Sequence, residues 1–357
     1  MKLFSKTLVA LATSMSLMVA GASSVNAEEK TEFKLAWSIY VGWMPWGWAA
    51  DQGIVDKWAD KYDIEIEVVQ FNDYIESINQ YTAGAFDGVT ATNMDTLAIP
   101  SVGGVDTTAL IVGDFSNGND ALILKDADSL DAVLGQNVNL VELSVSHYLL
   151  ARALETLGKA EKDVAVVNTS DADMIAAYQT DDVTAVVTWN PLVAEILEIP
   201  GANKVFDSSD IPGEIMDLTV VNTETLADNP AFGKALAGAW YETMSIMLSD
   251  TPEGAAARAA MGEASGTDLA GYDMQLASTQ MFATASDAVT FTTSESVTST
   301  MESVRTFLFE RGLLGDGASS PDIVGIAFPD GSVLGDEGNV KFRFNADYMS
   351  MAADGSL

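Results

Sequence analysis

The sequence predicts an α/β protein whose mostly parallel sheets are divided between two lobes, and three features indicate this class. Short apolar runs alternate with helical patterns from Phe33 to Val187, as in consecutive βαβ units. Breaks near 117–120 and 213–217 interrupt the alternation. Long helical patterns replace it after Asn222. If the chain enters a second lobe at the first break and returns at the second, two crossovers form a hinge beside a cleft.

The individual elements follow from hydrophobic period and from capping residues. Residues 64–69 alternate polar and apolar side chains, which is typical of a strand with one polar face. Asp73 stands where its carboxylate can cap the N-terminus of a helix. The expected strands are 33–37, 64–69, 88–91, 109–112, 121–124, 138–141, 164–167, 184–187 and 216–222. The expected helices are 46–62, 73–83, 94–102, 146–157, 171–179, 230–248, 252–262, 268–279 and 295–311.

The two breaks and the ends of the chain define five parts. Residues 1–27 are expected to be a signal peptide. Residues 28–116 and 217–318 form the first lobe, of which the second part is helical, and residues 117–216 form the second lobe. The C-terminal tail, 319–357, contains many Gly, Pro and Asp residues and is expected to be irregular.

The N-terminal segment has the three parts of a secretory signal peptide. Lys2 and Lys6 supply positive charge, and residues 7–20 are mostly apolar. The triplet that ends at Ala27 offers a cleavage site of the A-x-A type. No later segment reaches 18 consecutive apolar residues. The sequence therefore predicts an exported, periplasmic protein that is cleaved after Ala27.

The composition excludes several classes of function. Asp and Glu number 52 against 17 Lys and Arg, and a chain this acidic repels the phosphates of nucleic acids. The acidity is either a solvated surface suited to salty surroundings or a functional patch. Cysteine is absent and His147 is the single histidine, which excludes thiolate chemistry and multi-histidine metal sites. The sequence predicts neither a metal nor a cofactor.

Four segments resemble the substrate-binding proteins of ABC importers, in the class that takes nitrate, sulfonates and taurine. These segments are Gly84–Gly88, Glu142–His147, Asp171–Tyr178 and Ala185–Pro191. Each alone is a weak signal, whereas their order and spacing together are specific. The resemblance implies a type II periplasmic-binding-protein fold with a small-molecule ligand in the cleft. It also implies a monomer that works with the membrane permease subunits of an ABC importer.

Two further segments resemble one branch of that class. Met94–Leu97 and Val112–Asp120 are similar to the branch associated with urea-carboxylase clusters. This resemblance implies import of a urea-like or guanidine-like nitrogen compound, with guanidine as the best candidate. It implies a receptor rather than an enzyme, and no G-x-S-x-G nucleophile elbow is present in the sequence.

Candidate ligand-binding residues follow from the positions of the expected strands, because open α/β sheets bind ligands beyond the carboxyl ends of their strands. The carboxylates and aromatic rings at these positions are Trp37, Tyr40, Trp43, Trp46, Asp95, Asp114, Glu142, Trp189 and Asp217. This set of candidates contains no Lys or Arg. A small cation fits this set, because aromatic faces attract cations and a planar guanidinium pairs with a carboxylate through two hydrogen bonds.

Glu142 carries most of the argument for a cation, because an apolar strand leads into it and a helix follows. At about 4 Å and an effective dielectric of roughly 20, its carboxylate would repel an anion by about 4 kcal/mol, on the order of a thousandfold in affinity. Other candidates have structural explanations. The tryptophans within 43–48 recur at near-helical spacing, as core residues do. Asp95 can cap a helix, Asp114 can bind turn amides, and His147 can pack in a first helical turn.

Alternatives of other classes remain open at the level of sequence. Helix N-terminal amides alone can bind an anion such as a sulfonate, taurine or nitrate. A protein that binds or processes a thiamine-precursor pyrimidine is a second alternative, and an exported structural protein is a third. Stabilisation of the chain by a small molecule distinguishes a receptor from a structural protein.

Overall fold

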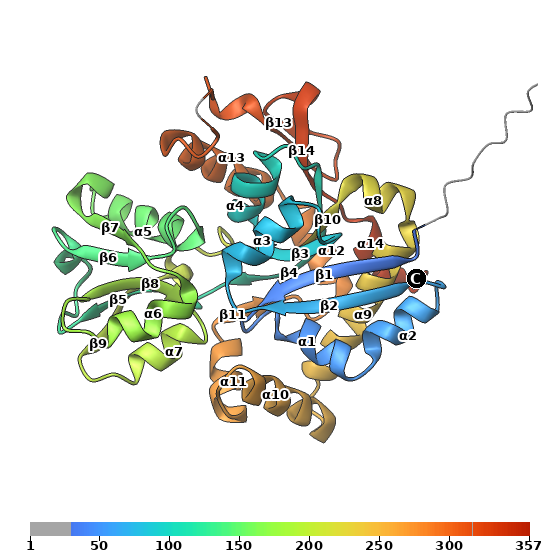
Figure 1. Ribbon diagram of the computed structural model, residues 1–357, viewed down its shortest axis with the longest axis horizontal. Helices are drawn as coiled ribbons and strands as arrows, with labels where there is room; N and C mark the ends of the chain where they lie inside the picture. The colour runs from blue at the N-terminus through green and yellow to red at the C-terminus, as the bar shows by residue number, and fades with distance from the viewer. Residues whose placement is uncertain (1–29, 316) are drawn as a thin grey trace, which may run out of the picture. The chain divides into compact units, whose positions relative to one another are not determined.

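Two β-sheets organise the part of the chain that the computed structural model describes, residues 30–315 and 317–357 (Figure 1). The larger sheet has nine strands in the order β13-β12-β14-β4-β10-β3-β1-β2, with β11 paired to β4. The smaller sheet has five strands in the order β7-β6-β8-β5-β9. The predicted signal peptide, residues 1–27, lies outside the described residues. The predicted α/β class with two sheets is confirmed.

The elements have the following bounds. The strands of the larger sheet are β1 (Glu32–Ser38), β2 (Glu65–Phe71), β3 (Gly88–Thr92), β4 (Thr107–Ser116), β10 (Met216–Asn222), β11 (Thr279–Met281), β12 (Gly325–Ala327), β13 (Val333–Leu334) and β14 (Val340–Phe344). The strands of the smaller sheet are β5 (Asp120–Lys125), β6 (Asn137–Leu140), β7 (Ala165–Asn168), β8 (Ala185–Trp189) and β9 (Ala202–Asp207). The helices are α1 (Met44–Asp51), α2 (Ile54–Asp60), α3 (Tyr74–Thr82), α4 (Asn93–Thr96), α5 (Val145–Thr156), α6 (Asp171–Tyr178), α7 (Leu192–Leu197), α8 (Thr223–Asp228), α9 (Pro230–Met247), α10 (Pro252–Ala264), α11 (Leu269–Leu276), α12 (Ala285–Thr292), α13 (Glu295–Glu310) and α14 (Asp347–Asp354).

The chain passes between the two sheets twice within the described residues. It leaves the larger sheet at Ser116 and enters the smaller one at Asp120, and it leaves the smaller sheet at Asp207 and re-enters the larger one at Met216. The strand that follows each passage is antiparallel to its neighbours: β5 to β8 and β9, and β10 to β3 and β4. The βαβ units β1–β2, β1–β3, β6–β7 and β6–β8 are parallel. The breaks in the sequence therefore coincide with the passages between sheets.

Two predicted helices are broken into shorter pieces. The helix expected over 46–62 is two helices, α1 and α2, because Gly53 adopts a left-handed conformation with φ +70°. The helix expected over 94–102 is α4 followed by one π-helical turn, Leu97–Ser101, which contains Pro100. Proline lacks the N–H that an α-helical bond needs, which accounts for the altered turn.

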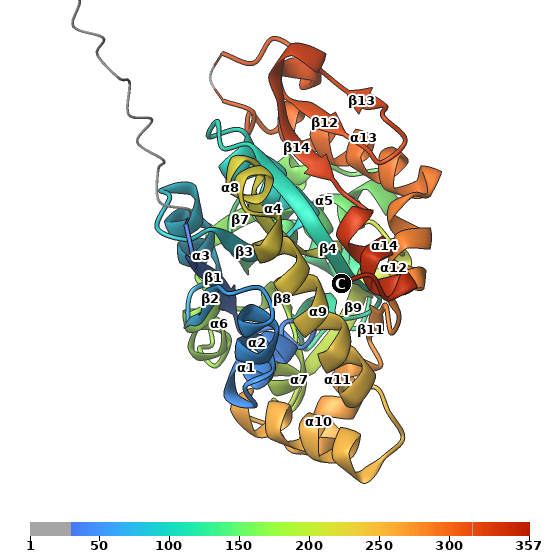
Figure 2. The same ribbon diagram turned by 90° about the vertical axis from the view of Figure 1, so that its right-hand side faces the viewer.

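The C-terminal tail is ordered, unlike the irregular segment expected from its composition. Residues Val340–Phe344 form β14, which runs parallel to β4 and extends the larger sheet (Figure 2). The side chains of Phe342 and Phe344 are buried and alternate with half-buried Lys341 and Arg343 along this strand. This period-two pattern spans only five residues, and the surrounding Gly and Asp residues predict turns, so the sequence does not indicate a strand here.

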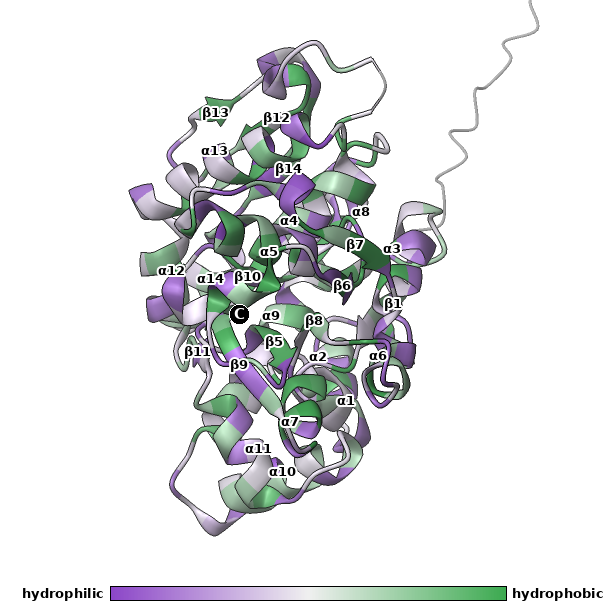
Figure 3. Ribbon diagram, turned by 90° about the vertical axis from the view of Figure 1, so that its left-hand side faces the viewer, coloured by the Kyte–Doolittle hydropathy of each residue, from purple (hydrophilic) through white to green (hydrophobic). Residues whose placement is uncertain are grey.

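The core of the chain lies on the faces of both sheets. In the smaller sheet, β5 is hydrophobic from Ala121 to Leu124 (Figure 3), and all four of these residues are buried. In the larger sheet, the ring of Phe33 on β1 stacks on that of Phe232 on α9 at 4.5 Å. None of the helices within the described residues is long and apolar enough to cross a membrane.

Candidate functional site

A small cavity of about 20 Å³ lies between residues of the two sheets. The larger sheet and its helices contribute five lining residues, and the smaller sheet and its helices contribute three. The eight lining residues are Tyr40, Trp43, Tyr74, Thr92, Asp120, Val145, Trp189 and Asp217. All eight side chains are buried.

Strand register brings the polar lining residues together. On the larger sheet, Asp217 of β10 lies opposite Thr92 of β3 and opposite Asp114 of β4. On the smaller sheet, Asp120 of β5 lies opposite Trp189 of β8. These two rows stand at the carboxyl ends of β3, β4 and β8, where α/β sheets bind ligands.

The first polar cluster is centred on Asp95, which is fully buried behind the cavity wall. Its carboxylate accepts hydrogen bonds from the Tyr74 hydroxyl at 2.7 Å, the Thr92 hydroxyl at 2.9 Å and the Val145 backbone N–H at 3.4 Å. Burial raises the pKa of Asp95 to about 6, and the hydrogen bonds oppose that rise. One carboxylate oxygen, Oδ1, has no hydrogen-bond partner. Asp95 therefore positions three lining residues and leaves one acceptor unpaired.

The second polar cluster joins Tyr40 to two aspartates. The Tyr40 hydroxyl lies 2.9 Å from Asp114 Oδ1 and 2.9 Å from Asp217 Oδ2. Asp217 lines the cavity, whereas Asp114 lies behind it and is fully buried. Burial raises the pKa of both carboxyl groups, and for Asp217 the neighbouring charge of Asp114 raises it further.

A third carboxyl group, that of Asp120, faces the cavity from the smaller sheet. The Ser116 hydroxyl donates to Asp120 Oδ2 at 2.5 Å, and the Asp120 backbone N–H donates to Ser116 Oγ at 3.1 Å. Burial raises the pKa of Asp120 to about 6. Asp120 and Asp217 therefore line the cavity, Asp95 lies behind its wall, and no Lys, Arg or His is among the eight described residues that line it.

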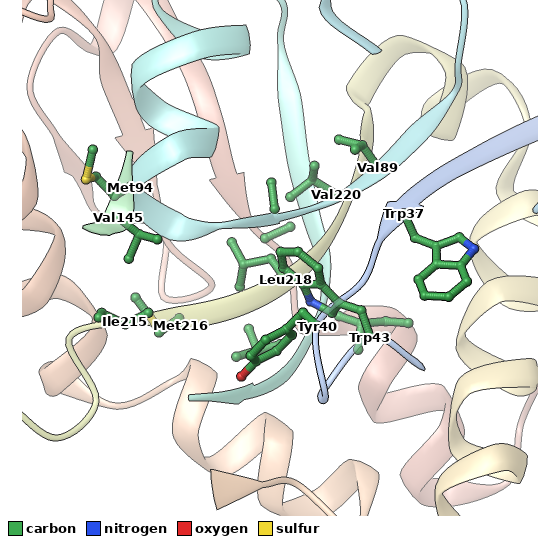
Figure 4. Close-up of a cluster of buried hydrophobic side chains, with 14 of the residues drawn as sticks. Trp37, Tyr40, Trp43, Val89, Met94, Val145, Ile215, Met216, Leu218 and Val220 are labelled. Atoms are coloured by element: carbon green, nitrogen blue, oxygen red, sulfur yellow. The ribbon is translucent and has the colours of Figure 1, made fainter. Parts of the chain in front are cut away.

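Aromatic rings form most of the remaining wall. The Tyr74 ring packs against Trp189 edge to face, with centroids 5.6 Å apart, and against Trp43 at 5.6 Å. The Tyr40 ring meets Trp43 edge to face at 4.9 Å. Figure 4 shows Tyr40 and Trp43 side by side and Trp37 apart from them. Contact between Tyr74 and Trp189 joins the two sheets directly at the cavity.

The structure divides the predicted site residues into three groups. Tyr40, Trp43, Trp189 and Asp217 line the cavity. Asp95 and Asp114 lie behind it and contact lining tyrosines. Trp37, Trp46 and Glu142 belong to other parts of the structure.

Trp37 and Trp46 are core residues rather than ligand contacts, which corrects the prediction for both. The Trp37 ring fills the space next to Gly47, where a Cβ would lie only 2.4 Å from Trp37 Cζ2. Trp46 is fully buried, donates from Nε1 to the Thr219 hydroxyl at 3.1 Å and packs on Trp240 at 5.3 Å. The structural explanation for the clustered tryptophans therefore holds for Trp46, whereas Trp43 reaches the cavity.

Glu142 is exposed and does not line the cavity, contrary to the prediction that placed most of the cation argument on it. The chain turns sharply after it, since Leu143 adopts a positive φ of 67° and Ser144 caps α5. This turn carries Glu142 to the surface and presents Val145, the first residue of α5, to the cavity. The buried carboxylates at the cavity are instead those of Asp95, Asp114, Asp120 and Asp217.

His147 packs in the first turn of α5, as one of the predicted explanations has it. The Leu143 N–H donates to its Nδ1 at 3.2 Å, and its Nε2 lies 2.8 Å from Glu161 Oε2. Since Nδ1 accepts, Nε2 carries the hydrogen and donates to Glu161. Among the described residues, no group of three or more His, Asp or Glu is placed to hold a metal ion.

Four lining residues were not among the candidates: Tyr74, Thr92, Asp120 and Val145. Thr92 ends a strand and caps the next helix, so the strand-exit rule could have found it. Tyr74 and Val145 begin helices just after capping residues, which is a usable signal in sequence. Asp120 begins its strand, and it reaches the cavity because β5 runs antiparallel to β8.

Comparisons with known proteins support the same fold. A model of the NMT1-like family matches residues 26–262. The taurine-binding periplasmic protein of Escherichia coli (strain K12) is 27% identical over 132 residues, which are 36% of this chain and 40% of that protein. The chain thus matches about two fifths of the length of this relative.

Two solved structures are similar over most of the chain. The alkanesulfonate-binding protein SsuA from Xanthomonas axonopodis pv. citri, bound to MOPS, has a TM-score of 0.65 and 15% identity, covering 81% of this chain and 96% of that one. The periplasmic nitrate-binding protein NrtA from Synechocystis PCC 6803 has a TM-score of 0.58 and 14% identity, covering 92% of this chain and 99% of that one. At this identity the likeness shows the periplasmic-binding-protein fold.

Proposed function

The chain belongs to the NMT1-like family, and we propose that it is a periplasmic solute receptor of an ABC importer that binds a small nitrogen-rich cation, with guanidinium as the best candidate. In this proposal the protein is exported by its N-terminal segment and delivers the solute unchanged to permease subunits. The family match, the fold of named solute-binding proteins and the cavity between two sheets support a receptor.

The charge of the cavity is the observation that carries the cation assignment. Asp120 and Asp217 line it from opposite sheets, and Asp95 and Asp114 lie directly behind its wall. Two buried carboxylate oxygens, Asp95 Oδ1 and Asp114 Oδ2, have no hydrogen-bond partner. Buried acceptors without donors favour a ligand that brings N–H groups and positive charge.

The aromatic rings and the size of the cavity restrict the cation further. The faces or edges of Tyr40, Trp43, Tyr74 and Trp189 surround the space, and each aromatic face adds about 0.5–2 kcal/mol to cation binding. The cavity of about 20 Å³ is far below the range of roughly 300–1,000 Å³ that drug-sized ligands occupy, so it favours a very small ligand, which the walls must move apart to admit. Guanidinium is planar, small and rich in N–H donors, so it can stack on a ring while it donates to Asp120 and Asp217.

Binding of a sulfonate, taurine or nitrate is the second candidate, and the comparisons favour it. The relatives that match are named for taurine, alkanesulfonate and nitrate. In this chain, however, two backbone N–H groups at the cavity already donate hydrogen bonds within the protein and are not free for an anion. The Thr92 N–H donates to the Tyr74 hydroxyl, and the Val145 N–H donates to Asp95. Of these ligands, taurine also carries an ammonium group, which the aspartates could accept, whereas nitrate brings only negative charge.

A ligand screen tests the proposal. Purified protein is titrated by calorimetry at pH 7 with millimolar guanidinium chloride, urea, agmatine, taurine, nitrate and hydroxymethylpyrimidine, and recovered solute is checked for chemical change by NMR. We expect guanidinium to bind most tightly and to be recovered unchanged. Binding of taurine or nitrate without binding of guanidinium would replace the cation by the anion candidate. Chemical conversion of the pyrimidine would replace the receptor by a processing enzyme.

A further inference from the structure

The hydroxyl group of Tyr40 lies at equal distance from two carboxyl groups. It is 2.9 Å from Asp114 Oδ1 and 2.9 Å from Asp217 Oδ2, yet a phenol has one proton to donate. Asp217 also lies directly opposite Asp114 in the pairing of β10 with β4. Two buried like charges at this separation are not ionised together, so one carboxyl group must hold a proton when the cavity is empty.

Within the part of the chain that the structure describes, the groups that face this pair supply no positive charge to replace that proton. The titratable groups that face it are Tyr40 from the segment before α1, Asp120 from β5 and Tyr272 from α11, and all are acidic or neutral. Asp120 is itself close to the charge of Asp95 on α4.

The remaining neighbours of the pair also bring no charge to it. Gly42 packs on the other side of Asp114, where a Cβ would lie 2.5 Å from Asp114 Oδ2. The positive charge of Arg258, on α10, lowers the pKa of Tyr272. Its guanidinium donates to Asp273 and to backbone carbonyls instead of to either aspartate of the pair.

We propose that Asp114, which does not line the cavity, determines the sign of charge that the site accepts, because it shares with Asp217 one proton that a bound cation releases to solvent. This inference rests on the proposed function. The exchange is balanced: the empty site carries one proton and the occupied site carries one cation, so the buried charge is the same in both states. A neutral carboxyl pair alone would not prefer cations, whereas a pair that can lose its proton does.

The exchange predicts a definite sign of proton linkage. Cation affinity rises with pH while the pair is protonated in the empty protein, by up to about tenfold for each pH unit. An anion would have the opposite linkage, because it would be repelled by ionised aspartates and would bind with proton uptake.

Calorimetry in buffers of different ionisation enthalpy counts these protons. Guanidinium chloride at millimolar concentration is titrated at pH 7 into the wild type, Asp114→Asn and Glu142→Gln. We expect the wild type and Glu142→Gln, whose changed side chain is exposed, to release the same number of protons, near one. Asp114→Asn should fold, bind guanidinium and release about one proton fewer, with a flatter pH profile.

A purely structural role for Asp114 gives a different result. In that case Asp114→Asn would lower affinity or stability and leave the proton count unchanged, which would overturn the inference. Wild-type binding without proton release would overturn it too, while leaving the proposed function intact. Binding of taurine or nitrate with proton uptake, in place of guanidinium, would refute both.

Infrared spectroscopy tests the shared proton without any ligand. We expect the empty wild type at pH 7 to show the carbonyl band of a protonated carboxyl group in a dry environment. Asp217→Asn and Asp114→Asn should each lose it, and Glu142→Gln should keep it. If the wild type lacks this band, the inference fails whatever the calorimetry gives. If the band is present but guanidinium and all other cations fail to bind, the proposed function and the cation exchange fail together.

Discussion

The two walls of the cavity differ in what they contribute. The wall from the larger sheet contains the Thr92–Asp217–Asp114 row and the Tyr40 hydroxyl, so it carries a carboxyl pair with raised pKa values. The wall from the smaller sheet contains Asp120 and Trp189.

The hydrogen bonds of the two walls explain the difference. The Asp120 carboxylate is bonded to Ser116, whereas Asp217 shares its one donor, Tyr40, with Asp114. A carboxylate that already accepts a hydrogen bond from the protein gains less from a further donor on a ligand. In the proposed receptor, the larger sheet therefore sets the charge of the ligand, and the smaller sheet covers the ligand with a ring.

The largest expected effect is on cation affinity when Asp217 is neutralised. Asp217→Asn should weaken guanidinium binding by about a hundredfold or more, since an unpaired buried charge costs on the order of 3–5 kcal/mol. Asp120→Asn should weaken it less, because the Ser116 hydroxyl already donates to that carboxylate. Calorimetry at pH 7 measures both, with Glu142→Gln as the control. Equal losses for the two variants would contradict the division between the walls.

A second effect separates ring contact with ligand from packing in the core. Trp189→Ala should weaken guanidinium binding by about 2 kcal/mol, or roughly thirtyfold, because a desolvated ring face is lost. Trp37→Ala should leave the affinity of the folded protein nearly unchanged and lower its stability by about 3–5 kcal/mol, because it empties part of the core. Calorimetry and thermal unfolding of both variants measure this split. A strong loss of affinity in Trp37→Ala would return that residue to the site.

The third prediction concerns the pH dependence of stability without ligand. Burial raises the pKa of Asp95 and of Asp120 to about 6, from an ordinary 3.8. Between about pH 4 and pH 6 the folded protein therefore binds more protons than the unfolded chain, and its stability falls as the pH rises. The loss is on the order of 3 kcal/mol for each group. Thermal unfolding should show a higher melting temperature at pH 5 than at pH 7.

The same reasoning predicts that neutralising Asp217 lowers cation affinity but raises the stability of the empty protein. Asp217→Asn should raise the free energy of unfolding at pH 7 in the empty protein, because it removes a carboxyl group whose pKa folding raises and which folding holds protonated. Glu142→Gln, an exposed substitution, should change it by less than about 0.5 kcal/mol. A destabilised Asp217→Asn variant would argue that the carboxyl pair stabilises the fold.

The smallest expected effect is on the contact that joins the walls beside the cavity. The Tyr74 backbone N–H donates to Asp171 Oδ2, on α6, at 3.3 Å. Asp171→Ala should speed ligand release about fivefold, since one hydrogen bond contributes about 1 kcal/mol. Asp171→Asn keeps an acceptor and should change the rate less. Stopped-flow tryptophan fluorescence measures release, with exposed Asp182→Ala as the control, and identical rates for all three variants would exclude a role in closure.

Particular residues show how far the sequence predicted the site. The strand-exit rule found Tyr40, Trp43 and Trp189, because strand ends are visible as the last residue of an apolar run. Asp217, also a candidate, stands at the start of its strand and reaches the cavity because β10 runs antiparallel to β3 and β4. The same rule selected Glu142, which also follows such a run. One residue with a positive φ, Leu143, turns the chain and carries Glu142 to the surface. A left-handed leucine has no signature in sequence, since bulky residues seldom adopt that conformation.

The sequence by itself determined the α/β class, the passages between sheets near 117–120 and 213–217, and the excess of acid over base, because hydrophobic period, turn residues and composition are local properties. Only the tertiary structure decided which acidic side chains are buried at the cavity. Asp114 and Asp217 are 103 positions apart in number and meet through the antiparallel pairing of β4 with β10, as Asp120 meets Trp189 through that of β5 with β8. Register between distant strands and burial of their ends belong to the assembled sheets, and these fix the charge of the cavity.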